Sequence, residues 1–477
     1  MMQLVFSVGL PWWFGYLIIQ IISGRKENEI VLIAIGYGYF IGCLLVIGLC
    51  ILYSLSWKFS ILLASVILAT INIMLFLYIK KRTLSTDKII RRIHGYKLLC
   101  NNTTVRIICT IGLAIIVTRL VSLGAEIILQ PLYPWDAYTS WLPKARLWFL
   151  SNELLPVIDG WKWMSGHNMP EDIYVHVSAR ERNYLSYITL WHSMAIGYWD
   201  ESLSLLPWLL AIAAFICAIA GQLLEADLPI PVIILVILLY LSMPILNSHV
   251  ALPGYADLWV SIFVTLAIAS LYHRSSQIGH LQSLLAGVMI LSCLLVKSQS
   301  GTVWACLLFL VAVVSYLDIT MRKIYLIVIS SAIACLSLIL IEVDIGDPKG
   351  INLIFNADLI KIPYLFNSAT PSVDEIMKRL IIIIKNLFFY SNWGLFWYLF
   401  IFSIISVIKS ASIITPPSII FFVLSSISIV LTYVFMVNYT NVSIDTVINR
   451  GFLHVVPAYL FIISIHTYKI QQINSTT

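Results

Sequence analysis

Residues 107–129 read Ile-Ile-Cys-Thr-Ile-Gly-Leu-Ala-Ile-Ile-Val-Thr-Arg-Leu-Val-Ser-Leu-Gly-Ala-Glu-Ile-Ile-Leu, and this stretch decides the fold class. A run of this length with only two charged side chains is long enough to cross the hydrocarbon core of a bilayer as a helix. Comparable runs of about 18 to 25 mostly apolar residues recur along the chain. Barrel strands would be shorter and would alternate between apolar and polar residues. The sequence therefore predicts an all-α polytopic membrane protein.

The composition of the whole chain excludes other classes. Of its 477 residues, 60% are hydrophobic and only 11% are charged, which would leave a soluble domain with too apolar a surface. We attribute the net charge of +6 to cytoplasmic loops, and we expect no nucleic-acid partner. Seven of the eight cysteines lie in apolar runs and Cys100 lies in a basic loop, so we expect neither disulfides nor a thiol metal site. Residues 1–22 lack a basic n-region and a cleavage site, and we interpret them as a retained span.

The strongest signal for topology is the loop that precedes residues 107–129. It carries eight cations and a single acid, Asp87, which makes it cytoplasmic by the positive-inside rule. The span at 107–129 then runs outward, and its Arg119 and Glu126, seven residues apart, share a face that we expect to turn into the bundle. The eight cations are Lys80, Lys81, Arg82, Lys88, Arg91, Arg92, Lys97 and Arg106.

Applied to the whole chain, this orientation predicts about thirteen transmembrane helices, with the N-terminus outside and the C-terminus inside. We divide the chain into residues 1–106, with three helices and the basic loop, and a catalytic module at 107–477 with outer loops at about 130–183 and 342–392. Residues 184–199 are predicted to be re-entrant or interfacial, and residues 376–390 interfacial. The spans are 4–22, 30–53, 61–78, 107–129, 203–223, 229–246, 258–272, 281–296, a ninth returning to Arg322 and Lys323, a tenth ending near 341, 393–408, 419–436 and 452–465.

The first outer loop opens with Pro-Trp-Asp-Ala-Tyr-Thr-Ser-Trp-Leu-Pro-Lys-Ala-Arg-Leu-Trp-Phe at 134–149. One acid, Asp136, lies among aromatic residues and is followed by Lys144 and Arg146. Because proline clashes with the preceding turn in a helix interior, Pro143 predicts a helix that starts near Thr139 or Ser140. This helix is amphipathic and suited to a membrane surface.

Four ionisable residues from distant parts of the chain are predicted to lie at the outer face: Asp136, Asp257, Lys297 and Arg450. Lys297 stands between two apolar spans, where a charge costs at least ~2.5 kcal/mol, so a partner or ligand is expected. We predict that the four line one cavity open to the outer face. The plainer alternatives are snorkelling of Lys297, a span-end anchor at Arg450, and helix N-caps at Asp257 and Asp136.

One acid beside outward cations suits sugar transfer from a polyprenyl phosphate. The leaving phosphate is an anion that needs no proton, so the second carboxylate that glycoside hydrolases use is not required. Asp136 would act as general base on the acceptor hydroxyl, while Lys297 and Arg450 would hold the phosphate by charge-assisted hydrogen bonds. The apolar bundle would receive the lipid tail.

Several stretches also resemble bacterial membrane glycosyltransferases of the GT-C superfamily, in the group of the dolichyl-phosphate-mannose protein mannosyltransferases and aminoarabinose transferases. They are Trp-Asp-Ala-Tyr-Thr-Ser-Trp-Leu-Pro-Lys-Ala-Arg-Leu-Trp-Phe at 135–149, Pro-Gly-Tyr-Ala-Asp-Leu at 253–258, Leu-Leu-Val-Lys-Ser at 294–298, Ser-Asn-Trp-Gly-Leu-Phe-Trp at 391–397 and Asn-Arg-Gly-Phe-Leu-His at 449–454. Two departures are Pro143 and the segment Arg-Glu-Arg-Asn at 180–183, which lacks the His and Pro of these relatives.

The resemblance implies an inverting glycosyltransferase with Asp136 as catalytic base and with Lys297 and Arg450 on the lipid phosphate. To the donor site we add Lys144, Arg146 and His454, and to the substrate site Asp257, His249, Tyr138, Trp141 and Tyr184. The implied location is the bacterial plasma membrane, with the active site on its outer face. Metal use stays open: Asp136 with Asp257 could hold a divalent metal ion, but the family includes metal-free members.

Two other functions stay open. A transporter or flippase of lipid-linked glycans would need a charged central cavity, and few charges besides Arg119 and Glu126 lie mid-span. A structural membrane subunit would leave Lys297 and the acidic aromatic loop unexplained. The sugar is not identified by these patterns, nor is the acceptor, which could be a protein, lipid A, a lipid-linked glycan or a cell-wall polymer.

Overall fold

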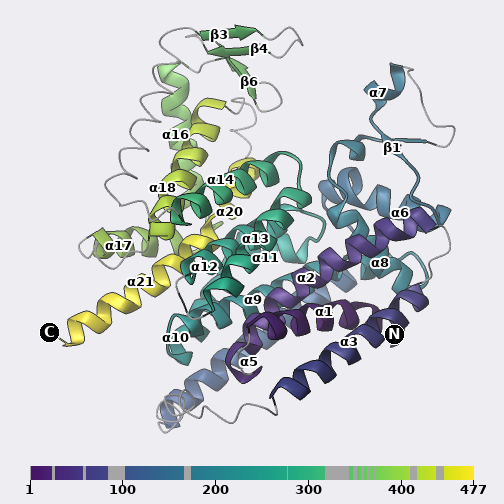
Figure 1. Ribbon diagram of the computed structural model, residues 1–477. Helices are drawn as coiled ribbons and strands as arrows, with labels where there is room; N and C mark the ends of the chain where they lie inside the picture. Colours follow the sequence, from purple (N-terminus) through teal and green to yellow (C-terminus); the bar gives the residue numbers. More distant parts are fainter. Residues whose placement is uncertain are drawn as a thin grey trace. The chain divides into compact units, whose positions relative to one another are not determined.

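The computed structural model is helical, with many long apolar helices (Figure 1). Among the residues that the structure describes, eight helices are long and apolar enough to cross a membrane, or up to ten if each of two bent pairs is one span. The prediction of a multi-pass helical membrane protein is therefore confirmed at this level, while the count of thirteen spans stays a prediction. The structure describes residues 2–23, 27–56, 61–83, 103–165, 173–274, 276, 278–316, 343–346, 352–355, 359–362, 366–369, 372–408, 416–436 and 445–476.

The chain forms two compact units, described separately below. Unit 1 comprises Met1–Ser242 and Leu246–Trp304, and unit 2 comprises Met243–Ile245 and Ala305–Thr477. The three N-terminal helices pack against α8, and α2 also packs against α9, within unit 1. The division of the chain after residue 106 stays a prediction.

Unit 1 begins with the first four predicted spans, each of which is a long apolar helix. Helices α1 and α2 pack closely because each has a glycine where they meet. A Cβ atom at Gly15 would lie 2.1 Å from the carbonyl oxygen of Gly38. The helices of the unit are α1 (Met2–Ser23), α2 (Glu27–Ser56), α3 (Ile61–Thr83), α5 (Thr103–Leu129), α9 (Pro207–Glu225), α10 (Ile230–Ser242), α11 (Pro244–Ala251), α12 (Asp257–Tyr272), α13 (Gly279–Val296) and the start of α14 (Gln299–Tyr316).

Helix α12 forms the centre of unit 1. It packs against α9 and α13, and every one of its side chains is buried, which explains how a helix of only 16 residues is stable there. A polar network crosses the same region: the Tyr37 hydroxyl lies 2.8 Å from Ser270 Oγ, and Gln222 Nε2 donates to the Tyr37 hydroxyl at 2.9 Å and to Gln282 Oε1 at 2.9 Å. These bonds join α2, α9, α12 and α13, because polar side chains in an apolar bundle must find partners on neighbouring helices.

The predicted span at 229–246 differs from the structure. Helix α10 ends at Ser242 and α11 begins at Pro244, with a bend of 67° between them. Pro244 has no N–H group to continue the hydrogen bonding of α10, which is the physical reason for the break. As a consequence His249 lies on α11 and not in the outer turn where the sequence placed it.

The segment predicted to be the first outer loop is folded into short elements, of which α6, β1 and α7 lie at one end of unit 1 (Figure 1). The helix predicted to start near Thr139 or Ser140 begins earlier: a helical segment starts at Trp135, passes through a π-helical turn and continues as α6 from Leu142, with Pro143 as the second residue of α6. Helix α8 is mostly buried and packs against α1, α2, α3 and α6. The elements are η1 (Ala137–Trp141), α6 (Leu142–Ser151), β1 (Val157–Ile158), α7 (Gly160–Met164), β2 (Tyr174–Val175), η2 (Val177–Arg180), α8 (Tyr184–Ile196) and η3 (Leu203–Leu205).

Unit 2 contains a sheet that the all-α prediction did not include. Strands β3 (Val343–Gly346), β4 (Asn352–Phe355), β5 (Leu359–Ile362) and β6 (Phe366–Ala369) pair in that order as an antiparallel meander. Asp344 pairs with Ile354, and Ile360 pairs with Ser368. Apolar and β-branched residues concentrated in short segments favour strands, which is the physical reason for the sheet in this loop.

The remaining elements of unit 2 are helical. Helix α16 (Val373–Phe388) covers most of the segment predicted to be interfacial, with Arg379, Ile383 and Asn386 buried and Lys378 and Ile381 exposed. The others are α17 (Phe396–Ile408), α18 (Pro416–Val430), η5 (Leu431–Met436), α20 (Asp445–Leu453) and α21 (Val456–Thr476), the last two being bent by 42°. The predicted tenth span, and the cations predicted at 88–97, 322, 323 and 409, lie outside the described residues.

Candidate functional site

The break between α13 and α14 holds a buried ion pair. Helix α13 ends at Val296, Lys297 has an extended backbone, and α14 begins two residues later. Lys297 Nζ donates to Asp257 Oδ1 at 2.7 Å, and the exposed fractions of the two side chains are 18% and 2%. The partner that the sequence analysis required for Lys297 is therefore Asp257, at the first position of α12.

This pair leaves Lys297 able to bind something else. An ammonium group carries three N–H donors, and the structure uses one of them on Asp257. The fraction of the Lys297 side chain that remains exposed gives an approaching anion access to the others. Asp257 thus holds the ammonium in place and compensates its charge.

A second contact fixes the next residue of the break. Glu181 Oε2 accepts from the backbone N–H of Ser298 at 3.3 Å and from its hydroxyl at 3.0 Å. Glu181 was only one of several loop acids in the sequence, and no spacing pointed to Ser298, because the two residues are 117 positions apart. Only the fold brings them together.

Lys144 is buried and anchors the same loop. Its Nζ donates to the Glu181 carbonyl oxygen and to Asn183 Oδ1, both at 2.8 Å. Burial lowers the pKa of Lys144 to about 8, while the nearby Glu181 carboxylate acts in the opposite direction. Two of the three donors of Lys144 are therefore used to hold the loop at residues 181–183.

The segment that carries Asp136 packs against the loop that precedes Asp257. Ala137, the next residue, packs so closely on Gly254 that a Cβ atom at Gly254 would lie 2.4 Å from the Cβ of Ala137. Trp141 Nε1 donates to the Gly254 carbonyl oxygen at 2.6 Å. Since Gly254 precedes Asp257 by three residues, the segment with Asp136 lies against the segment with Asp257. Asp136 itself is partly buried.

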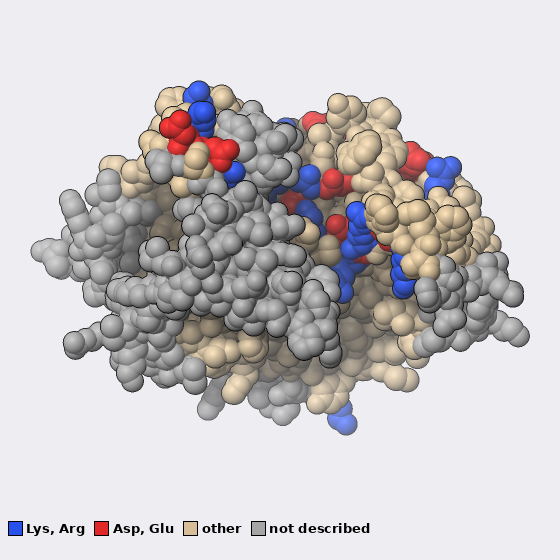
Figure 2. Space-filling view, turned by 90° about the horizontal axis from the view of Figure 1, so that it is seen from above, with Lys and Arg blue, Asp and Glu red and all other residues tan. Residues whose placement is uncertain are grey.

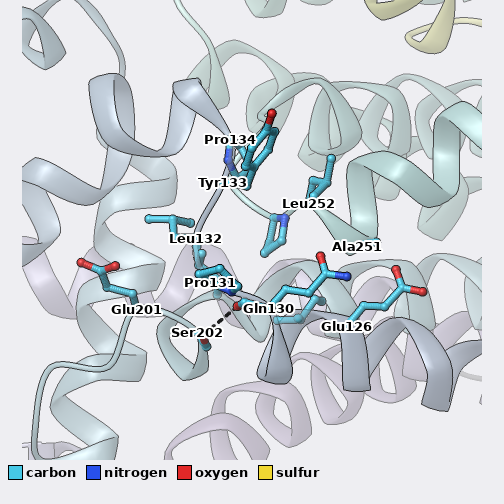
Figure 3. Close-up of a pocket in the computed structure, with 13 residues that line it drawn as sticks. Glu126, Gln130, Pro131, Leu132, Tyr133, Pro134, Glu201, Ser202, Ala251 and Leu252 are labelled. Carbon is cyan, nitrogen blue, oxygen red and sulfur yellow. Dashed lines mark hydrogen bonds between the residues drawn. The ribbon is translucent and has the colours of Figure 1, made fainter.

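A small pocket lies beside these two segments (Figure 3). It is lined by the end of α5, by residues 130–134 just before Asp136, by Glu201 and Ser202, and by residues 251–253 just before Gly254. Figure 3 shows Glu126 and Glu201 on opposite sides of the pocket, with the Ser202 hydroxyl 3.4 Å from the Gln130 carbonyl oxygen. The lining contains two carboxylates and no lysine or arginine, so the pocket suits hydroxyl groups better than an anion.

The remaining predicted residues of unit 1 have mixed positions. Trp141 and Tyr184 are buried, and Tyr184 makes edge-to-face ring contacts with Trp259, so neither offers a free aromatic face to a sugar. Tyr138 is half exposed, with its hydroxyl donating to the Leu132 carbonyl oxygen. His249 is buried with its ring 5.0 Å from that of Tyr255. Arg146 is exposed and forms an ion pair with Glu201 at 3.6 Å.

Arg450 and His454 belong to unit 2. They lie on and just after α20, whose Asn449 side chain is held by Trp393 Nε1 at 2.9 Å and by Asn386 Oδ1 at 2.7 Å. Arg450 is partly buried and His454 is buried. The structure thus brings together Asp257 and Lys297, and through Ala137 the segment of Asp136, while Arg450 is placed within its own unit.

The donor set at this site does not fit a divalent metal ion. An ammonium group already lies 2.7 Å from Asp257, where a cation bound by that carboxylate would have to sit. No group of three or more His, Cys, Asp or Glu side chains with metal-binding geometry occurs among the described residues. In Figure 2, basic and acidic side chains lie next to one another on the face seen from above, as expected for charges compensated by the protein itself.

Comparisons of the chain with protein-family models, with curated proteins and with solved structures found no match. The local geometry of unit 1 is therefore the basis for the function proposed below.

Proposed function

We propose that this protein is an integral membrane glycosyltransferase that transfers a sugar from a polyprenyl-phosphate donor to an acceptor, at the outer face of a bacterial plasma membrane. The observation that carries the proposal is the Asp257–Lys297 ion pair at the α13–α14 break, beside the segment that holds Asp136. The cation is held in place but still partly exposed, and the segment that carries Asp136 packs against the loop before Asp257, which supports transfer from a phosphate.

In this reaction the acceptor hydroxyl oxygen forms a bond to the anomeric carbon of the sugar, and its proton passes to the Asp136 carboxylate. The bond from the anomeric carbon to the phosphate oxygen breaks, and the phosphate leaves with the electron pair. Lys297 stabilises the charge that develops on that oxygen. The products are the glycosylated acceptor, with inverted configuration, and the polyprenyl phosphate. The pocket just before Asp136 is where an acceptor hydroxyl would enter.

The test is transfer of radiolabel by the purified full-length protein from polyprenyl-phosphate sugars to candidate acceptors. Asp136→Asn keeps shape and polarity but cannot accept a proton, so turnover should fall by ~10²–10⁴-fold with little change in donor affinity. Lys297→Ala removes a contact made to the phosphate in both ground and transition states, so donor affinity and turnover should both fall. Near-normal turnover of a folded Asp136→Asn variant would reduce Asp136 to a structural residue.

The same preparations distinguish the alternative function. Reconstituted vesicles that move a lipid-linked glycan across the bilayer, without any transfer of label, would favour a transporter or flippase. Lys297→Ala removes the ammonium group that compensates the buried Asp257 carboxylate, so this variant could fail to fold. The double variant Lys297→Ala, Asp257→Asn then replaces it, because it removes both charges together.

A further inference from the structure

The charged residues of unit 1 around the Asp257–Lys297 ion pair do not by themselves favour the binding of a phosphate. Of the cations whose contacts were described above, Arg146 is already paired with Glu201. The other two are Lys297 and Lys144, and three carboxylates accompany them: Asp136, Asp257 and Glu181. A phosphodiester approaching Lys297 would therefore meet a surplus of negative charge. The donor site of the proposed function, on which the following inference rests, needs a further cation from this unit.

Residues 181–183 form a loop that is held on two sides, by one contact to its backbone and by contacts to the Glu181 and Asn183 side chains. Glu181 accepts two hydrogen bonds from Ser298, the residue directly after Lys297. On the other side, Lys144 donates to the Glu181 carbonyl oxygen and to the Asn183 side chain. Consecutive Cα atoms are about 3.8 Å apart, so residue 182 is fixed between two anchored neighbours.

Arg182 is the residue at that position. Its side chain is exposed, and within the described part of the chain it makes no ion pair or hydrogen bond. The two other arginines of this region are already paired, Arg180 with Asp159 and Arg146 with Glu201. A guanidinium group with all its donors free, on a loop anchored to the residue beside Lys297, is ready to bind a phosphate in a bidentate manner.

We propose that Arg182 binds the phosphate of the polyprenyl carrier together with Lys297. Glu181, Asn183 and Lys144 act as positioning residues that hold the loop against the α13–α14 break. Lys297 then supplies the partly desolvated point charge, and Arg182 supplies the fork-shaped donor and the third cation that balances the three carboxylates.

The experiment measures binding of a polyprenyl monophosphate to the full-length protein in phosphatidylcholine nanodiscs, which requires no knowledge of the sugar or acceptor. Arg182→Gln should raise the dissociation constant about 10–100-fold, the usual range for losing a hydrogen bond to a charged group. Arg182→Lys should restore part of this, because charge remains but the bidentate geometry is lost. Arg180→Gln, an exposed arginine two positions away, is the matched control and should bind as the wild type does.

Each result has a defined consequence. If the wild type binds the carrier and Lys297→Ala weakens binding, while Arg182→Gln does not, the role of Arg182 is refuted and the proposed function stands. If the wild type does not bind the carrier, both are refuted. Competition by inorganic phosphate or by an equal amount of phosphatidylglycerol would show a general anion site and overturn the assignment to the carrier. Equal losses in Arg182→Gln and Arg180→Gln would reduce the effect to surface charge.

Discussion

Lys297 illustrates how a single charged residue can be tolerated at the end of an apolar helix. An unpaired charge there would cost several kcal/mol, and the Asp257 carboxylate, itself buried, offsets that cost through a 2.7 Å hydrogen bond. The two residues depend on each other, because each one alone would be an uncompensated charge in an apolar environment.

This dependence predicts a double-mutant result. Asp257→Ala should destabilise the protein by about 3 kcal/mol, somewhat reduced by the partial exposure of Lys297, because it strands the ammonium group. Asp257→Ala combined with Lys297→Met should restore a large part of that loss. Melting temperatures of the purified variants in detergent measure both, and a double variant less stable than the sum of the singles would contradict mutual compensation.

Lys144 gives a prediction about pH. Burial lowers its pKa to about 8 in the folded protein, whereas an unfolded chain keeps an ordinary lysine pKa of about 10.4. Between these values the unfolded state binds more protons, so the free energy of unfolding should rise with pH across this window, by about 1.4 kcal/mol per unit of pKa difference. The comparison of wild type with Lys144→Met from pH 7 to pH 10 isolates this contribution. Stability curves that stay parallel would show that Lys144 titrates normally.

Among the elements, the loop before α12 and the turn η1 are packed together at one glycine. Gly254 has a φ of +118°, a conformation that other residues rarely adopt, and it leaves no room for a Cβ atom beside Ala137. The Trp141 indole N–H donates a hydrogen bond to the carbonyl oxygen of Gly254. This contact sets the separation between the segments that carry Asp136 and Asp257.

Gly254→Ala should therefore lower stability by about 1–3 kcal/mol and disturb turnover, because both the backbone conformation and the contact with Ala137 are lost. The matched control is Gly287→Ala on α13, where a Cβ atom would meet nothing within 4 Å and helix propensity should improve by about 0.5–1 kcal/mol. Equal melting temperatures for the two variants would remove the structural importance of the Gly254–Ala137 contact.

For the whole molecule, the proposed function depends on which face of the membrane carries the first outer loop. The basic loop at residues 80–106 predicts that this loop is cytoplasmic and that residues 130–183 are on the other side. Single cysteines introduced at positions 85 and 165 of a cysteine-free protein should react with impermeant reagents from opposite sides. Labelling from the same side would place Asp136 on the opposite face of the plasma membrane from the proposed acceptor.

Much of the helical framework was predictable, and the failures have identifiable reasons. Long apolar runs such as 107–129 became helices with nearly the expected ends, because their length and composition leave no other structure in a bilayer. The span predicted at 229–246 is divided at Pro244, because proline has no N–H group to continue the helix. The loop after residue 342 forms an antiparallel meander, because its short segments are rich in residues that favour strands. The span predicted at 258–272 is helix α12, whose 16 residues are stable because its neighbours bury it completely.

The sequence by itself determined the membrane class, the apolar helices and the residues worth examining, since these depend on local composition and on charge along the chain. The tertiary structure decided what those residues do: that Asp257 pairs with Lys297, that Glu181 binds Ser298, and that Lys144 is consumed in positioning a loop. Such pairings join residues from 37 to 117 positions apart. No periodicity encodes them, because they arise from how helices pack and not from how any one helix forms.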